Sequence, residues 1–170
     1  TLIEGWTFKQ ALAAVRSHPM IVQTLTSLST DQIMERLGHA GVYPEGRFFP
    51  DTYLFPRGTT DAGVLKRAYQ RMEKVLAEEW QGRAEGLPIK TPYEALILAS
   101  IVEKETGVAD ERTQVAGVFT RRLQKGMLLQ TDPTVIYGMG ETYDGNIRRK
   151  DLRTDTPYNT YVHPGLTPTP

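Results

Sequence analysis

Two glutamates near the end of one predicted helix carry the most specific chemistry in this sequence. Helical periodicity and start signals predict a helix over residues 91–106. At about 100° per residue, Glu105 continues the apolar stripe of this helix, which consists of Leu98, Ile101 and Val102. A carboxyl group at the edge of an apolar surface holds its proton more strongly, because burial disfavours the charged form. Glu105 is therefore a candidate general acid, a group that can protonate the oxygen of a leaving group.

Glu103 lies on another face of the same predicted helix. It is two residues from Glu105, so its side chain is expected to point away from the apolar stripe. A structural role stays open for both carboxylates. A glutamate in the last turn of an amphipathic helix commonly pairs with a nearby Arg or Lys, and Glu103 beside Lys104 has the pattern of a solvated pair.

Composition indicates one soluble domain and excludes several classes of site. The chain has 170 residues, of which 39% are hydrophobic and 24% charged. Lys and Arg number 20, as do Asp and Glu, and this zero net charge argues against a protein that binds nucleic-acid phosphates. The absence of cysteine excludes disulfides, thiol nucleophiles and Cys-ligated zinc. The three histidines lack metal-ligand spacing, so no metal site is expected, and the longest apolar run, residues 95–102, is too short to span a bilayer.

Apolar periodicity, caps and breakers predict a mostly helical chain. Helices are predicted over residues 7–18, 20–28, 29–37, 59–81, 91–106 and 110–125, with a further short helix opening at Asp132. The helix at 91 has the clearest start, because Thr91 can cap it, Pro92 suits its first position and Glu94 completes a capping box. A short strand is expected at Leu2–Ile3, and a charged hairpin or loop at 141–155. We therefore predict an α+β fold, predominantly helical, with a small β-sheet.

A segment rich in proline and aromatic residues interrupts the helices. Three prolines within residues 43–58 forbid a regular helix there, so this segment is predicted to be a loop. It divides the chain into a helical N-terminal part over residues 1–42, the loop itself, and a core over residues 59–170 that contains the helix 91–106.

Aromatic rings and polar side chains gather in the irregular segments. Rings beside Asn, Gln and Asp suit sugars, which present apolar C–H faces and hydroxyl rims. Gln130 and Thr131 come just before the helix predicted at Asp132, where they could line a cleft. Core packing of the rings and ordinary turn chemistry in residues 129–134 are the alternative interpretations.

Four phrases of the sequence resemble those of the MltG-type (YceG-like) endolytic murein transglycosylases. They are Pro44–Tyr53 (PEGRFFPDTY), Ala99–Thr106 (ASIVEKET), Leu129–Gly138 (LQTDPTVIYG) and Tyr158–Tyr161 (YNTY), the last followed by Gly165 and Leu166. Their order and spacing also match, and the resemblance covers essentially the whole chain. It implies a lysozyme-like catalytic domain built around the helix of Glu105, with Glu105 as the essential carboxylate.

The resemblance implies cleavage of the bond between N-acetylmuramic acid (MurNAc) and N-acetylglucosamine (GlcNAc) in peptidoglycan strands. The expected products are 1,6-anhydroMurNAc ends, formed without a cofactor or a metal, and the reaction would terminate or trim nascent strands. Three other functions stay open. They are a hydrolytic muramidase of lysozyme type, a pyridoxal-phosphate-dependent aminodeoxychorismate lyase, and a non-catalytic peptidoglycan-binding module.

The phrases that carry the resemblance must converge on one site if they serve one substrate. We therefore expect further site residues around Glu105, namely Glu103, Gln130, Tyr137, Asn159 and Tyr161. Substrate-binding residues are expected at Phe49, Tyr53, Thr131 and Asp132.

The resemblance also implies a cellular setting. It predicts a single-pass protein of the bacterial inner membrane whose catalytic domain lies in the periplasm. A transmembrane helix and a LysM-like subdomain are expected upstream of this chain. The implied partners are peptidoglycan glycan strands and the cell-wall synthesis machinery, such as penicillin-binding proteins, but no nucleic acid.

Overall fold

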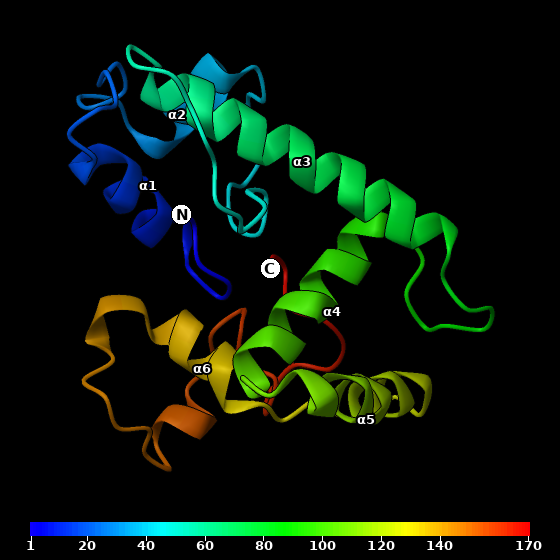
Figure 1. Cartoon of the computed structure of the whole chain (residues 1–170). Coiled ribbons are helices and arrows are strands. Elements are labelled where there is room, and N and C mark those ends of the chain that lie inside the picture. The colour runs from blue at the N-terminus through cyan, green and yellow to red at the C-terminus, as the bar shows by residue number, and fades with distance from the viewer. The chain divides into compact units, whose positions relative to one another are not determined.

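Six of the seven predicted α-helices form, and the one predicted over residues 20–28 does not. The computed structural model describes residues 1–170, and Figure 1 shows its helices in chain order. The α-helices are α1 (Phe8–Ser17), α2 (Thr30–Leu37), α3 (Asp61–Gln81), α4 (Pro92–Glu105), α5 (Arg112–Gln124) and α6 (Asp132–Met139). Short 3-10 helices occupy Ala109–Glu111, Gly140–Thr142 and Asp151–Arg153. The chain divides into two units, Thr1–Gln81 and Gly82–Pro170, so α3 belongs with the N-terminal helices.

The predicted β-sheet is absent, so the expectation of an α+β fold is wrong and the fold is helical only. The one β-type contact is an isolated parallel bridge between Val22 and Thr60. Leu2 does lie beside an extended segment, but the contact is a single backbone bond from its N–H to the oxygen of Asp51, 3.0 Å long. The prolines of residues 43–58 lack the N–H donors that a ladder requires, so no strand forms.

The helix predicted over residues 20–28 does not form, because a buried carboxylate captures the backbone donors of this segment. Asp61 is fully buried at the start of α3. It accepts hydrogen bonds from the N–H groups of Thr24, at 3.0 Å, and Leu25, at 2.9 Å. The N–H of Ala62 donates to it at 2.8 Å. These bonds satisfy the first turn of α3 and hold the 20–28 segment in turns.

Two capping boxes and one apolar core organise the N-terminal unit. The side chains of Thr7 and Gln10 cap α1 reciprocally, and those of Ser29 and Gln32 cap α2. The buried residues of these helices and of α3 pack together; the largest fully buried ones are Leu25, Ile33, Met34 and Leu65.

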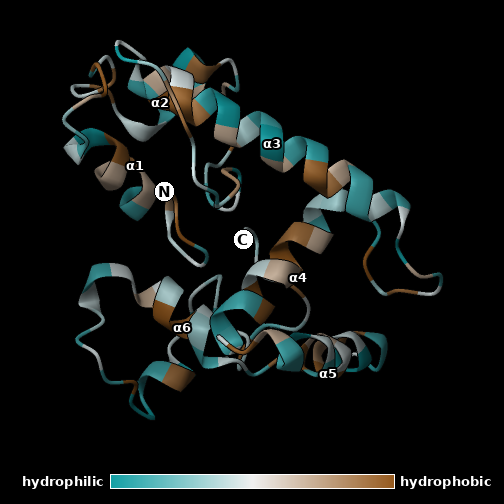
Figure 2. Cartoon of the chain, viewed as in Figure 1, coloured by the Kyte–Doolittle hydropathy of each residue, from teal (hydrophilic) through white to brown (hydrophobic).

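Helix α4 is the centre of the C-terminal unit. Thr91 caps it by accepting from the N–H of Glu94, and Pro92 occupies its first turn, as predicted. Its buried side chains are Leu96, Ile97, Leu98, Ile101 and Val102. Figure 2 shows these hydrophobic turns along the middle of α4 and hydrophilic residues at its end. The helix packs against α5 and α6, which places its last turn beside the start of α6.

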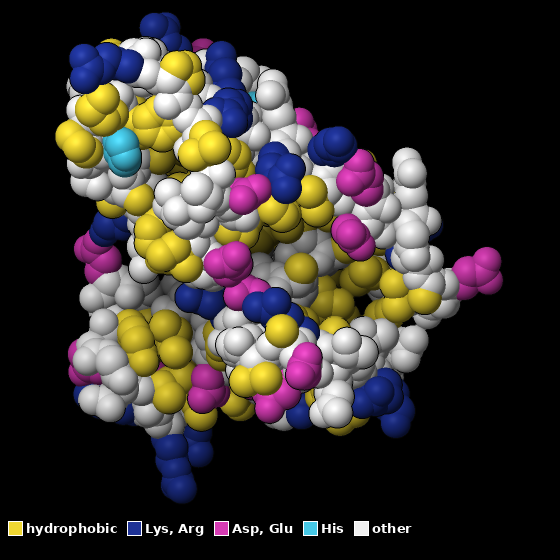
Figure 3. Space-filling model, viewed as in Figure 1, with side chains coloured by type: hydrophobic (Ala, Val, Ile, Leu, Met, Phe, Trp, Pro, Cys, Tyr) yellow, Lys and Arg dark blue, Asp and Glu magenta, His cyan; other side chains and the backbone are white.

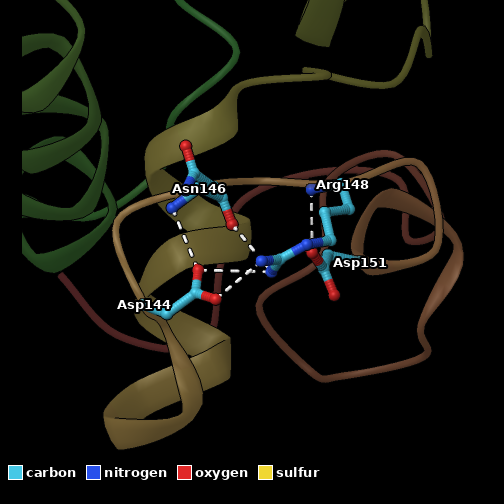
Figure 4. Close-up of polar contacts among 4 residues, drawn as sticks. All are labelled: Asp144, Asn146, Arg148 and Asp151. Carbon is cyan, nitrogen blue, oxygen red and sulfur yellow. Dashed lines mark hydrogen bonds and ion pairs between the residues drawn. The ribbon is translucent and has the colours of Figure 1, made fainter.

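Residues 141–155 form an ordered loop rather than a hairpin. Figure 4 shows how Arg148 holds this loop together. Its guanidinium donates to both carboxylate oxygens of Asp144, at 3.2 and 2.6 Å, while the N–H of Asn146 donates to Asp144 at 3.1 Å. The N–H of Arg148 donates to the buried Asp151 at 2.8 Å. Carboxylates of the loop accept hydrogen bonds from its backbone N–H groups, so these groups do not need the partner strand of a hairpin.

The surface mixes charges of both signs. Figure 3 shows Lys and Arg side chains interspersed with Asp and Glu on the face in view, in keeping with a formal net charge of zero. None of the helices is long and apolar enough to cross a membrane.

Candidate active site

Glu105 ends α4 and meets the segment that leads into α6. The hydroxyl of Thr131 donates a hydrogen bond of 2.6 Å to Oε2 of Glu105. Thr131 is buried, with 2% of its surface exposed, whereas Glu105 is exposed. The expectation that Glu105 is partly buried was wrong, because the buried stripe ends at Val102 and the last turn projects beyond it. The hydroxyl partner, rather than burial, distinguishes this carboxylate.

Glu103 has a different environment from Glu105, and it is not the solvated partner of Lys104 that the sequence indicated. It forms an ion pair of 3.0 Å with Arg112, the first residue of α5. Its side chain is 29% exposed, so it is less exposed than the helix geometry alone suggested. The pair fastens the end of α4 to the start of α5, which gives Glu103 a structural role.

Tyr161 and Asp132 form a second polar contact next to Glu105. The Tyr161 hydroxyl donates to Oδ1 of Asp132 at 2.6 Å. Burial is the main reason that the pKa of Tyr161 rises to about 12, and the hydrogen bond to Asp132 and the charges of Asp132 and Glu105 add to it. The nearby Arg122 acts in the opposite direction. Tyr161 is therefore a neutral hydroxyl near Glu105 at any physiological pH.

Gln130 is exposed and has an unusual backbone conformation. Its φ is 52°, and no other residue except glycine has a positive φ in this structure. An ordinary side chain in the left-handed region costs about 1–2 kcal/mol. The N–H of Gln130 donates to the oxygen of Thr160 at 3.2 Å, and the guanidinium of Arg122 donates to the oxygen of Leu129. These bonds hold the corner at residues 129–131 against the strain.

Asn159 is fully buried and bonds to backbone. Its Nδ2 donates to the oxygens of Leu152, at 3.2 Å, and Thr154, at 2.7 Å. Its Oδ1 accepts from the N–H of Tyr161 at 2.9 Å. Asn159 therefore ties the 151–154 turn to the segment that carries Tyr161, and it positions that tyrosine.

Tyr137 lies on α6, where its ring packs edge-on against Tyr158 with centroids 4.8 Å apart. The Tyr158 hydroxyl bonds in turn to the hydroxyl of Thr169 at 3.0 Å. The contacts of Tyr137 thus connect α6 with the C-terminal segment.

Phe49 and Tyr53 belong to the N-terminal unit. The Tyr53 hydroxyl donates to the oxygen of Phe49 at 2.6 Å. Arg71 and Arg67, both on α3, lie over the rings of Phe49 and Tyr53 at 5.2 and 5.8 Å from the centroids. These cation–π contacts attach the loop to α3.

Two buried threonines near Glu105 were missed by the sequence analysis. Thr134 and Thr160 are 5% and 2% exposed, and their hydroxyls lie 2.8 Å apart, next to Thr131. Threonine at a helix start or in a turn is so common that only its place inside two of the four phrases could have singled it out. No group of three or more His, Asp or Glu side chains gathers in a way that could hold a metal ion.

Comparison with known proteins places this site in a family. The profile of the YceG-like family matches residues 1–170. A Bacillus subtilis protein named endolytic murein transglycosylase is 37% identical over 126 residues, which are 74% of this chain and 34% of that protein. A Streptococcus pneumoniae protein of the same name is 30% identical over 174 residues, covering 98% of this chain and 31% of that protein. The chain thus spans about a third of the length of these curated relatives.

A solved structure is similar as well. The crystal structure of a protein described as yceG-like, from Listeria monocytogenes, superposes with a TM-score of 0.75 and 27% sequence identity. The superposition covers 99% of this chain and 60% of the Listeria chain. The full-length family match, the sequence relatives and this structure agree, and the chain belongs to the YceG-like family.

Proposed function

We propose that this chain carries the catalytic site of an endolytic murein transglycosylase. The enzyme would cleave the MurNAc–GlcNAc bond inside glycan strands and leave 1,6-anhydroMurNAc ends, so that it terminates or trims nascent strands. Membership of the YceG-like family and the names of the curated relatives support the proposal. The observation that carries it is the bond of 2.6 Å between Thr131 and Glu105, which brings together two of the phrases that make up the resemblance.

The proposed reaction uses Glu105 twice. Protonated Glu105 gives its proton to the oxygen that links the two sugars, and the bond from that oxygen to the muramyl anomeric carbon breaks. The 6-hydroxyl of the same MurNAc bonds to that carbon and passes its proton to ionised Glu105. The proton from the 6-hydroxyl replaces the one that Glu105 gave away, so Glu105 ends in its starting state and no water is consumed.

This mechanism needs no second catalytic carboxylate. Hydrolytic glycosidases use a pair of carboxylates at a defined separation. The two other acidic residues of the predicted site are already engaged, Glu103 with Arg112 and Asp132 with Tyr161. An intramolecular 6-hydroxyl nucleophile fits a site with one available carboxylate better than an activated water does.

The residues around Glu105 would share the binding of sugar hydroxyls. Gln130 and Asp132 are exposed, and Tyr161 offers a neutral hydroxyl. We assign Gln130, Asp132 and Tyr161 to contacts with the strand. Phe49 and Tyr53 stay predicted sugar-stacking residues of the N-terminal unit.

We further propose that the full protein is anchored in the inner membrane by one N-terminal helix. A LysM-like subdomain would follow, and the catalytic domain would face the periplasm, because peptidoglycan lies outside that membrane. There the enzyme would act on nascent strands beside penicillin-binding proteins. Protease accessibility of the full-length protein in spheroplasts tests the orientation, and cross-linking in living cells tests the partners.

Mass spectrometry of digested glycan strands tests the activity. The full-length protein and its Glu105→Gln variant are incubated with purified strands. Anhydro ends from the parent protein and none from the variant are expected. Reducing ends would indicate a hydrolytic muramidase, and binding without cleavage would indicate a peptidoglycan-binding module. Pyridoxal absorbance of the purified protein would favour the lyase instead.

A further inference from the structure

We infer that three buried threonines, Thr131, Thr134 and Thr160, here called the relay, position the carboxylate of Glu105 for proton transfer. The hydroxyls of Thr134 and Thr160 hold the backbone of Thr131, and the hydroxyl of Thr131 bonds to Glu105. The relay residues are positioning residues, since they act through Glu105 and do not themselves reach a substrate. The inference rests on the proposed function only for the role of Glu105 as the acid; the contacts of the relay stand independently of it.

The three threonines of the relay are buried. Thr131, Thr134 and Thr160 are 2%, 5% and 2% exposed. The N–H of Thr131 donates to the hydroxyl oxygen of Thr160 at 3.1 Å, and the hydroxyls of Thr160 and Thr134 lie 2.8 Å apart. The Thr134 hydroxyl donates to the backbone oxygen of Thr131 at 2.7 Å. The Thr160 hydroxyl also lies 3.4 Å from the backbone oxygen of Thr131. Buried polar groups are expensive to leave unpaired, so this network holds the backbone of Thr131 in place.

The hydroxyl proton of Thr131 is available to Glu105. If Thr134 donates to the Thr131 carbonyl, the Thr160 hydroxyl can donate to Thr134 while it accepts from the Thr131 N–H. The Thr131 hydroxyl then has its own proton to give, and it gives it to Oε2 of Glu105 at 2.6 Å. An oxygen that already accepts this bond is the poorer site for a second proton. The proton that Glu105 delivers is therefore placed on Oε1.

The relay also restricts the rotation of an exposed side chain. A free glutamate at a helix end samples several rotamers, and fixing them costs up to about 2 kcal/mol. The bond from Thr131 fixes the carboxylate before the substrate arrives, which is the preorganisation that proton transfer requires.

The strained corner at Gln130 supports the same interpretation. Thr160 binds two successive N–H groups, that of Gln130 through its backbone oxygen and that of Thr131 through its hydroxyl. The left-handed conformation of Gln130 is thus maintained by the residue that closes the relay. Strain that the surrounding contacts enforce is typical of functional sites.

Several charged groups lie near Glu105. The charge of Glu105 acts on Tyr161, which is bonded to Asp132, and the charge of Arg122 on α5 acts on the same tyrosine. On α4 itself Lys104 precedes Glu105, and Glu103 is paired with Arg112. A test of the relay must therefore remove one hydroxyl and leave these charges unchanged.

Thr131→Val does this, because valine has the shape of threonine without the hydroxyl. In the full-length protein we expect kcat on glycan strands to fall about tenfold, with KM within about twofold. The alkaline limb of the pH–rate profile, which reports loss of the proton from the acid, should move to higher pH, since ionised Glu105 loses a hydrogen-bond donor. Thr131→Ser, which keeps the hydroxyl, should restore both quantities. Thr167→Val removes another buried hydroxyl of the same unit and should change neither.

A second measurement separates the relay from the proposed activity. The carboxyl carbon of Glu105 is followed by NMR as the pH is varied, in the parent protein and in Thr131→Val, with no substrate present. A midpoint that moves to higher pH in the variant supports the relay even if no strand is cleaved. An unchanged midpoint overturns it, as does a loss of kcat that Thr131→Ser fails to rescue.

If Thr131→Val does not fold, Thr160→Val and Thr160→Ser take its place. Thr160→Val removes the acceptor of the Thr131 N–H, so the relay predicts the same direction of change, and Thr160→Ser should again restore it. Equal behaviour of the two Thr160 variants in the Glu105 titration would overturn the inference.

Discussion

The hydroxyl of Tyr161 donates a hydrogen bond of 2.6 Å to Asp132, across 29 positions of the chain. Asp132 begins α6, and Tyr161 lies in the C-terminal segment. The charge of Glu105 also contributes to the raised pKa of Tyr161. One side-chain bond thus closes the C-terminal segment over the start of α6 and brings a neutral phenol to the candidate acid.

Tyr161→Phe should therefore change both stability and its pH dependence. Loss of a hydrogen bond to a charged group costs about 1.5–3 kcal/mol, and less here because Tyr161 is half-buried. The pKa of Tyr161 is raised to about 12, so its contribution is fully present below the ordinary tyrosine value near 10 and is lost as the pH rises to about 12. Urea unfolding at pH 8 and pH 11, followed by circular dichroism, gives the free energy of unfolding at each pH. This free energy should fall less between pH 8 and pH 11 in the variant than in the parent. An equal difference in both proteins would refute this.

Asp61→Asn should destabilise the N-terminal unit. Burial by itself would raise the pKa of Asp61, but the bonds from Thr24, Leu25 and Ala62 outweigh it and hold that pKa below its usual range. Asparagine cannot accept all of these bonds, so we expect a loss of about 2–3 kcal/mol at pH 7. Because the folded pKa is lowered, the stabilisation is present above about pH 4 and is lost as the pH falls through the folded value.

Tryptophan fluorescence measures this effect selectively. Both tryptophans, Trp6 and Trp80, lie within Thr1–Gln81. Urea titrations at pH 7 and pH 3 give the free energy of unfolding at each pH. The difference between these two free energies should be smaller for Asp61→Asn than for the parent protein. Asp31→Asn, at an exposed position in the first turn of α2, serves as the control and should cost well under about 1 kcal/mol. Similar losses in both variants would contradict the assignment.

Gly138→Ala should destabilise the C-terminal unit although alanine favours helices. A Cβ at Gly138 would lie 2.5 Å from the Thr156 hydroxyl and 3.2 Å from Cβ of Tyr158. Overpacking of this kind costs about 1–3 kcal/mol and outweighs a gain of about 1 kcal/mol in helix propensity. Thermal unfolding by circular dichroism measures the loss, and adding Thr156→Ala should recover part of it. Gly117→Ala is the matched control, since its nearest neighbour is the flexible end of Arg121 at 3.1 Å.

Gln130→Gly should separate stability from activity. Glycine adopts the φ of 52° without a steric penalty, so we expect the variant to be more stable by up to about 1 kcal/mol. The amide that we assign to strand binding is lost, so kcat/KM on glycan strands should fall. Thermal unfolding and strand cleavage are measured on the same preparation. A variant that is both less stable and fully active would show that neither strain nor the amide matters.

The helices could be predicted from the sequence because their signals are local. Thr91 and Pro92 start α4 where the capping pattern placed them. The predicted capping box does not close, because the carboxylate of Glu94 accepts from the N–H of Lys90. The predictions of a sheet and of a helix over residues 20–28 were wrong, because contacts with residues distant in the sequence determine the structure of those segments. Asp61 takes the backbone donors of Thr24 and Leu25, which no local pattern reveals.

The candidate site divides in the same way. Glu105 and Tyr161 were selected from the phrases that contain them. The charge of Glu105 contributes to the raised pKa of Tyr161. The partly buried environment expected for Glu105 was wrong, since helix periodicity gives a direction but not the depth of the surrounding structure. The threonine relay depends on Thr131 and Thr160 meeting across 29 residues, and a single sequence contains no signal for that contact.

The two glutamates of α4 give the most direct test of the site. Glu105→Gln keeps the shape of the side chain, and its amide oxygen can still accept from Thr131, so folding should be nearly unaffected. It cannot deliver a proton, and cleavage of glycan strands should fall about 10²–10⁴-fold. Glu103→Gln breaks only the partly exposed ion pair with Arg112, which is worth about 0–1 kcal/mol, and should cost far less activity.

Both variants are compared with the parent for anhydro ends by mass spectrometry and for unfolding by circular dichroism. An inactive Glu103→Gln beside an active Glu105→Gln would reverse the assignment, because the reacting face of α4 would then be the one directed towards Arg112. Equal loss in both variants, with unfolding unchanged, would mean that the ion pair also positions the acid. That outcome would extend the positioning network from the start of α6 to the start of α5, since Arg112 is the first residue of that helix.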